Sequence, residues 1–147
     1  MKVSTNMPAD DLKFRHAIDD ANRWRGRMVN LFARGELIIA QRLQAGLNAK
    51  PLPMLTSQRI TRLTTLVDGN KRQSDALRIF GDLAKDRNSI VHGSGKIHLD
   101  RDGRWLLTLV LIDRNGMITS AVSQADAEKR DRELKATVDR LAAAFRA

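Results

Sequence analysis

Residues 10–47 read DDLKFRHAIDDANRWRGRMVNLFARGELIIAQRLQAGL, and their apolar side chains recur every three or four positions. This spacing is typical of an amphipathic α-helix. It predicts one long helix, or two nearly collinear ones, that begins at an N-cap formed by Asp10 or Asp11. Gly26 and Gly35 are the predicted places for a bend. Gly35 also falls on the apolar stripe itself, where a glycine lets a second helix approach closely.

Two further helical segments follow this one. Pro51 and Pro53 end the long helix, because two prolines two positions apart cannot continue it. The apolar spacing then predicts a short helix over residues 57–67 and another over residues 71–91, with Gly93 as its natural stop.

After Gly95 the apolar pattern changes from helical spacing to alternation. Three strands are predicted, over residues 96–99, 105–112 and 117–122, and the turn signals between them favour an antiparallel meander. Ser123 and Asp126 resemble a capping box for a last helix. We therefore expect a mainly α fold in which a small antiparallel β-meander, about residues 96–122, is inserted before the C-terminal helix. A single domain is predicted to cover residues 1–147.

Composition narrows the classes of protein to consider. The 147 residues are 42% hydrophobic and 29% charged, which is ordinary globular composition. The chain contains no cysteine, so disulfides, thiolate metal sites and cysteine nucleophiles are excluded. Residues 1–6 lack the apolar run of a signal peptide, and nowhere do about 18 apolar residues run together. We expect a protein of the cytoplasm with no membrane partner.

The formal charge of +9 is unevenly distributed. Residues 23–72 hold ten basic and two acidic side chains, a net charge of +8. A clustered basic surface favours a polyanionic partner such as RNA or DNA. The arginines predicted to contact RNA are Arg23, Arg25, Arg27, Arg34, Arg59 and Arg62. Two alternatives remain: a merely solvated basic surface, and a helical DNA-binding protein, which is less favoured because no helix-turn-helix spacing stands out.

One short segment combines side chains that can do chemistry. It is Arg87-Asn88-Ser89-Ile90-Val91-His92, at the end of a predicted helix. Asn88 and His92 are four residues apart and share a helical face, and the long Arg87 side chain can reach the same place. The other histidines, His16 and His98, are predicted to be exposed. No histidines or carboxylates have the spacing of a zinc site, so no metal is expected.

This segment resembles the R-x(4–6)-H motif of the HEPN superfamily (higher eukaryotes and prokaryotes nucleotide-binding). Gly35-Glu36-Leu37 is also similar to a glutamate-containing segment of many such domains. The resemblance implies a HEPN-like helical bundle that often forms homodimers. Many HEPN proteins are metal-independent ribonucleases of toxin–antitoxin and other defence systems, and others bind RNA or nucleotide without cleaving it.

The resemblance suggests roles for four residues of this chain. Arg87 would bind and stabilise phosphate, His92 would be general base or acid, Asn88 would orient them, and Glu36 is a supporting candidate. We expect no cofactor, RNA as a partner, a homodimer, and a protein antitoxin as a further partner. Two alternatives stay open: a noncatalytic HEPN-like module that binds RNA or protein, and purely local structural contacts of Arg87, Asn88 and His92.

Overall fold

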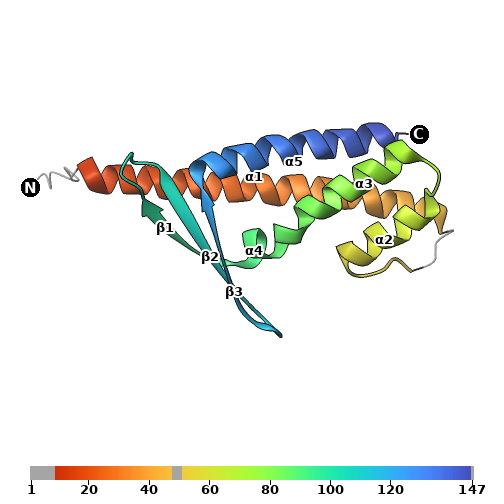
Figure 1. Ribbon diagram of the computed structural model, residues 1–147, viewed down its shortest axis with the longest axis horizontal. Helices are drawn as coiled ribbons and strands as arrows, with labels where there is room; N and C mark the ends of the chain where they lie inside the picture. The colour runs from red at the N-terminus through yellow and green to blue at the C-terminus, as the bar shows by residue number, and fades with distance from the viewer. Residues whose placement is uncertain (1–8, 48–50, 147) are drawn as a thin grey trace, which may run out of the picture.

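The protein is described by a computed structural model that covers residues 9–47 and 51–146 (Figure 1). Residues 1–6, in which no signal peptide is predicted, and Lys50 of the basic segment lie outside the described residues. In chain order the elements are α1 (Ala9–Gly46), α2 (Thr56–Leu66), α3 (Lys71–Leu83), the 3-10 turn η1 (Ala84–Asp86), α4 (Arg87–His92), β1 (Ser94–Leu99), β2 (Trp105–Asp113), β3 (Gly116–Ser123) and α5 (Gln124–Ala144). As predicted, a mainly helical chain carries a three-stranded antiparallel sheet before its last helix.

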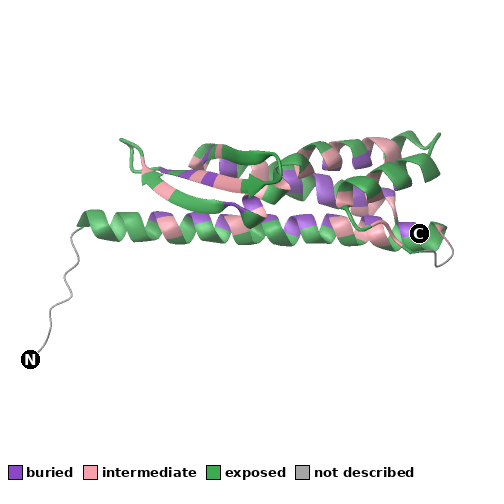
Figure 2. Cartoon of the chain, turned by 90° about the horizontal axis from the view of Figure 1, so that it is seen from below, coloured by how far each residue is buried: buried purple, intermediate pink, exposed green. Residues whose placement is uncertain are grey.

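The long N-terminal helix is one element of 38 residues. Figure 2 shows α1 running unbroken beneath the other elements, without the bend predicted at Gly26 or Gly35. Its predicted apolar stripe is its buried face, which includes Trp24, Met28, Phe32, Ile39 and Leu43. Gly35 lies on this face against the ring of Phe80 in α3, so the missing side chain leaves room for that ring.

Three helices cover the buried face of α1. α5 lies along α1, α3 packs against α5, and α2 packs on α1 near its C-terminal end (Figure 1). The α5 helix begins at the predicted cap, where the Ser123 hydroxyl accepts a hydrogen bond of 3.1 Å from the backbone N–H of Asp126. Its buried side chains include Leu134, Val138 and Leu141.

The helix predicted over residues 71–91 is not continuous, which corrects the sequence interpretation. It is interrupted by η1, and α4 begins afresh at Arg87. A 3-10 turn advances by about 120° per residue where an α-helix advances by about 100°, so three such residues add roughly 60° of rotation. The rotation turns Asn88 outward and buries Ile90, whereas a continuous helix would have placed Asn88 and Val91 on the apolar stripe. It also directs Arg87 toward α1.

The sheet is a meander with the order β1-β2-β3. Its strands begin and end within two residues of the predicted positions, and the predicted turns contain Gly103 and Gly116, both with positive φ. Trp105 and Leu107 are buried against the helices, whereas the far end of the β2–β3 hairpin extends away from them (Figure 1). Ile112 and Met117, which pair there, are 77% and 71% exposed.

Candidate functional site

The site begins with an ion pair between two elements far apart in the sequence. Arg87, the first residue of α4, places its Nε 2.5 Å from Oε1 of Glu36 on α1. The side chains are 30% and 17% exposed, and both atoms are buried without a well-aligned hydrogen bond to any described residue. A partly buried pair of this kind fixes the position of the guanidinium, because separating the charges would leave each one poorly solvated.

Asn88 joins this pair from the next position. Its Oδ1 accepts a hydrogen bond of 3.2 Å from Nη1 of Arg87. With Nε facing Glu36 and Nη1 facing Asn88, the orientation of the guanidinium plane is set from two sides. Arginine binds phosphate through two parallel N–H donors, so a guanidinium fixed in this way is suited to receive one. The structure therefore brings Arg87, Asn88 and Glu36 together.

These three residues line the wall of an open pocket of about 430 Å³. The opposite wall comes from α2 and the residues just before it, which contribute Arg59, Ile60, and the segment 54–57. Lys85 of η1 completes the basic side chains around the pocket. A volume of this size lies in the range of about 300–1,000 Å³ typical of small-ligand sites.

His92 lies at the other end of α4 and does not line this pocket. It is the last residue of the helix and is exposed. It lies four positions after Asn88, so the two side chains share one side of α4, about 6 Å apart along its axis. The imidazole is therefore open to solvent beside the pocket rather than inside it.

The backbone around His92 is held by a side chain of α1. Arg25 donates from Nε to the carbonyl of Ile90 at 2.9 Å and from Nη2 to the carbonyl of Gly93 at 2.7 Å. Burial lowers the pKa of the Arg25 guanidinium below its ordinary value, yet an arginine stays protonated at neutral pH. Gly93 itself has no room for a side chain, because a Cβ there would overlap the carbonyl oxygen of Ser89.

Arg25→Gln will lower the free energy of unfolding by about 1.5–3 kcal/mol, because it removes charged donors from two backbone carbonyls. Arg23→Gln, two residues away at an exposed position, is the matched control and will change it by less than about 0.5 kcal/mol. Urea unfolding followed by circular dichroism measures both changes. Equal effects of the two substitutions would refute the anchoring role of Arg25.

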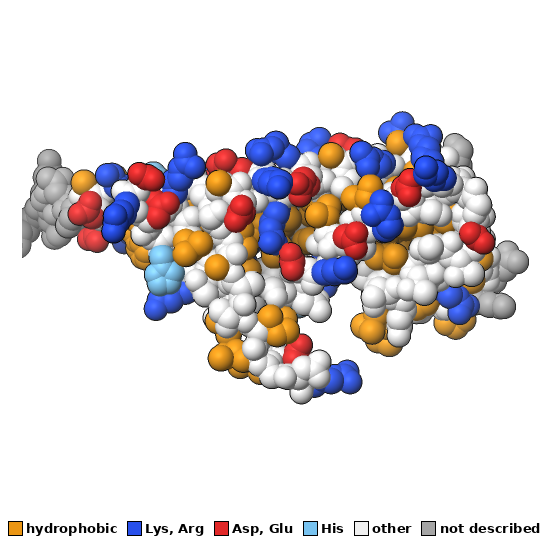
Figure 3. Space-filling view, viewed as in Figure 1, with side chains coloured by type: hydrophobic (Ala, Val, Ile, Leu, Met, Phe, Trp, Pro, Cys, Tyr) orange, Lys and Arg blue, Asp and Glu red, His pale blue; other side chains and the backbone are white. Residues whose placement is uncertain are grey.

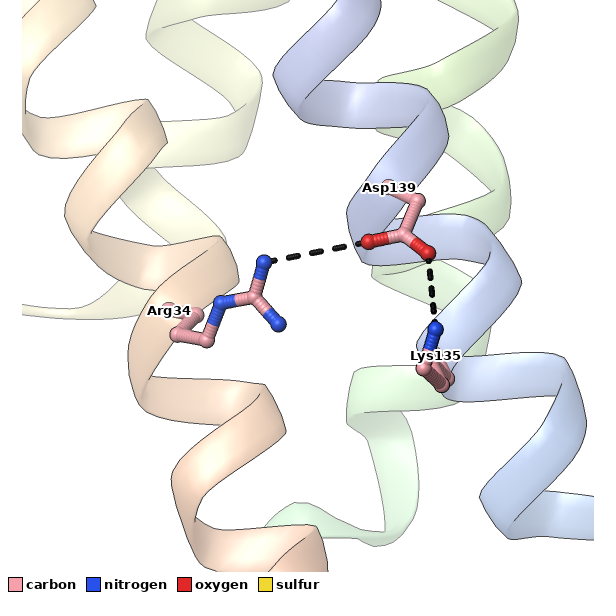
Figure 4. A network of polar contacts seen from close by, with 3 residues as sticks. All are labelled: Arg34, Lys135 and Asp139. Carbon is pink, nitrogen blue, oxygen red and sulfur yellow. Dashed lines mark hydrogen bonds and ion pairs between the residues drawn. The ribbon is translucent and has the colours of Figure 1, made fainter.

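The remaining arginines predicted to contact RNA do not share one surface. Arg27 and Arg34 pair with carboxylates of α5: Arg27 with Asp131 at 3.1 Å, and Arg34 with Asp139 at 3.7 Å, where Lys135 also contacts Asp139 (Figure 4). Across the helical body, basic and acidic side chains are interspersed (Figure 3). Arg23 and Arg62 are exposed elsewhere, and among the predicted RNA-binding arginines it is Arg59 that lines the pocket with Arg87.

Other kinds of site have less support in the described structure. Within residues 9–47 and 51–146, no three histidine or carboxylate side chains gather where a metal ion could bind. His16 and His98 are exposed on α1 and β1. In the same part of the chain, no helix is both long and apolar enough to cross a bilayer.

The chain was compared with protein-family models, curated proteins and solved structures. None of them matches it. The geometry of the site is therefore the basis for assigning a function.

Two residues of the site have positions that the sequence did not indicate: Lys85, which was not a candidate, and Arg25, which was predicted to contact RNA. Lys85 precedes Arg87 by two positions, and a continuous helix would have separated them by about 200°. Arg25 was grouped with the arginines of a basic surface, and nothing in its neighbourhood signals that it reaches the end of α4, 65 residues later. A contact of that range is set by how α1 and α4 pack, which local spacing does not show.

Proposed function

We propose that the protein is a HEPN-like, metal-independent endoribonuclease. The observation that carries the proposal is the arrangement along α4. A guanidinium held by Glu36 and Asn88 lies at the start of the helix, and an exposed imidazole lies at its end. The resemblance of Arg87–His92 to the HEPN motif adds to it, as do the basic side chains around the pocket.

The proposed reaction is transesterification within RNA. The ribose 2′-oxygen loses its proton to a base and attacks phosphorus, the bond to the 5′-oxygen breaks, and an acid protonates that leaving oxygen. Arg87 binds the phosphate and stabilises the charge that develops on it. His92 exchanges one of the protons, while Glu36 and Asn88 hold Arg87 in place.

One histidine cannot be base and acid in the same step. The proposal therefore includes a two-fold homodimer, in which a second copy of the chain supplies the second imidazole. Following the HEPN resemblance, we also propose a toxin or defence role in the cytoplasm, with a protein antitoxin as a further partner.

The test is incubation of the purified full chain with labelled single-stranded RNA in EDTA. We expect cleavage that leaves a 2′,3′-cyclic phosphate and a 5′-hydroxyl, and no cleavage of the same sequence as DNA or as 2′-O-methyl RNA, because both lack the nucleophile. Failure to cleave any RNA would refute the catalytic proposal. Binding of RNA without cleavage would favour the noncatalytic module instead.

A further inference from the structure

The pocket beside Arg87 is larger and more basic than the binding of one phosphate requires. Three basic side chains line it, Arg59 from α2, Lys85 from η1 and Arg87 from α4, against one carboxylate, Glu36. The formal charge of these groups is +2, and Glu36 is already paired with Arg87. Arg59 therefore brings positive charge to the pocket beyond what the Glu36–Arg87 pair uses, and Lys85, which pairs with Asp82 outside the pocket, adds to its basic lining.

The two basic groups differ in how firmly they are held. Arg59 donates from Nε to the carbonyl of Pro53 at 2.6 Å, which fixes the guanidinium at one end and leaves its terminal nitrogens for a ligand. The side chain of Lys85 is 77% exposed, and its Nζ lies 3.3 Å from Oδ1 of Asp82, which does not line the pocket. An exposed ion pair of this kind is weak, so the ammonium group can turn toward a ligand.

The wall formed by α2 and the residues before it adds polar and apolar groups. Thr56 and Ser57 contribute hydroxyls at the first turn of the helix, whose N-cap position is occupied by Leu55 without a side-chain hydrogen bond. The first amides of a helix have no acceptor within the helix. Met54, Leu55 and Ile60 give the same wall an apolar part. Anion donors next to an apolar surface match a phosphate joined to a nucleoside.

We propose that this pocket binds the RNA nucleotide next to the scissile phosphate, with Arg59 and Lys85 on its phosphate and the apolar wall on its base or sugar. The inference rests on the proposed function, because it takes the phosphate bound by Arg87 to be the scissile one. It adds a subsite that positions the strand, formed by residues outside the Arg87–His92 motif. The subsite is expected to prefer an extended single strand, because two adjacent phosphates must reach Arg87 and the α2 wall at the same time.

The experiment measures binding of a fluorescent 12-nucleotide 2′-O-methyl RNA, which the enzyme cannot cleave, by anisotropy over a range of salt concentrations. Two pairs of variants are matched by position. Lys85→Ala is compared with Arg78→Ala. Both side chains pair with Asp82, but only Lys85 lines the pocket. Arg59→Ala is compared with Arg62→Ala, one turn further along α2 and outside the pocket.

We expect Lys85→Ala and Arg59→Ala each to weaken binding by about threefold to tenfold and to reduce the salt slope by about 0.7, the value for one phosphate contact in a single strand. Arg78→Ala and Arg62→Ala will change the Kd by less than about twofold. Circular dichroism checks that each variant is folded. If loss of the hydrogen bond between Arg59 and Pro53 unfolds Arg59→Ala, the comparison of Lys85→Ala with Arg78→Ala still tests the subsite.

The possible results separate the two proposals. Equal weakening by all four substitutions would overturn the subsite, since it would show a diffuse basic surface. Absence of binding by the wild-type chain would overturn both the subsite and the RNA proposal. Selective weakening by the pocket variants, in a chain that does not cleave unmodified RNA, would support the pocket as a binding site for an RNA nucleotide and refute the catalytic proposal alone.

Discussion

His92→Ala will lower the rate of RNA cleavage by about 10²–10⁴-fold, the usual contribution of a positioned proton donor or acceptor. His92 is exposed at the end of α4, so its removal leaves the core unchanged. Single-turnover cleavage of labelled RNA in EDTA measures the effect, and unfolding by urea will show a stability close to that of the wild-type chain.

Two other variants make this result specific. His98→Ala changes an exposed histidine on β1 and will leave the rate within about twofold, as expected for a surface substitution away from the site. Arg87→Ala will reduce cleavage by about 10²–10³-fold, because the phosphate loses its oriented donor. Full activity of His92→Ala would exclude His92 as the proton donor or acceptor of the reaction.

Phe80→Ala will lower the free energy of unfolding by about 3–5 kcal/mol, the range for removing a buried aromatic side chain. Phe80 is fully buried, its ring centroid is 6.4 Å from that of Phe32, and it lies against Gly35. Truncation leaves a cavity at the contact between α1 and α3. Urea or thermal unfolding monitored at 222 nm gives the change.

The Gly35 position allows a second, coupled test. Gly35→Ala alone will destabilise the protein by about 1–3 kcal/mol through overpacking, because the added Cβ falls 2.6 Å from Cζ of Phe80. Gly26→Ala, on the same helix with nothing within 4 Å, will stabilise it by up to about 1 kcal/mol. In the double variant Gly35→Ala/Phe80→Ala the two losses will not add. Additive losses would contradict the contact.

Much of the fold could be predicted from local patterns. The three- and four-residue spacing of α1 and the glycines of the two hairpin turns mark elements that local sequence determines. The interruption at η1 could not be predicted, because Ala84-Lys85-Asp86 has no helix-breaking residue. The packing of Ile90 and Arg87 against α1 accounts for it instead, and that is a tertiary effect.

The sequence indicated the motif residues of the candidate site but not their surroundings. Arg87, Asn88 and His92 are close in sequence and lie on one short helix, but helical spacing did not show that α4 begins afresh at Arg87 or that Arg87 faces Glu36. Lys85 and Arg59 meet at the pocket through the packing of α2 against α1 and α3. Arg27 and Arg34 show the opposite error. They belong to a basic segment of the sequence and were predicted to contact RNA, but the fold pairs them with carboxylates of α5.

The two anchors of α4 have a mechanical consequence. Glu36 holds the first residue of α4 and Arg25 holds its last turn, and both belong to the single helix α1. The short helix is thus fixed at both ends to one rigid rod, antiparallel to it. Fluctuations that lift α2 would widen the pocket and admit a polymer strand without changing the spacing between the guanidinium and the imidazole. Opening of the pocket at α2 and the spacing of Arg87 from His92 are, in this architecture, mechanically independent.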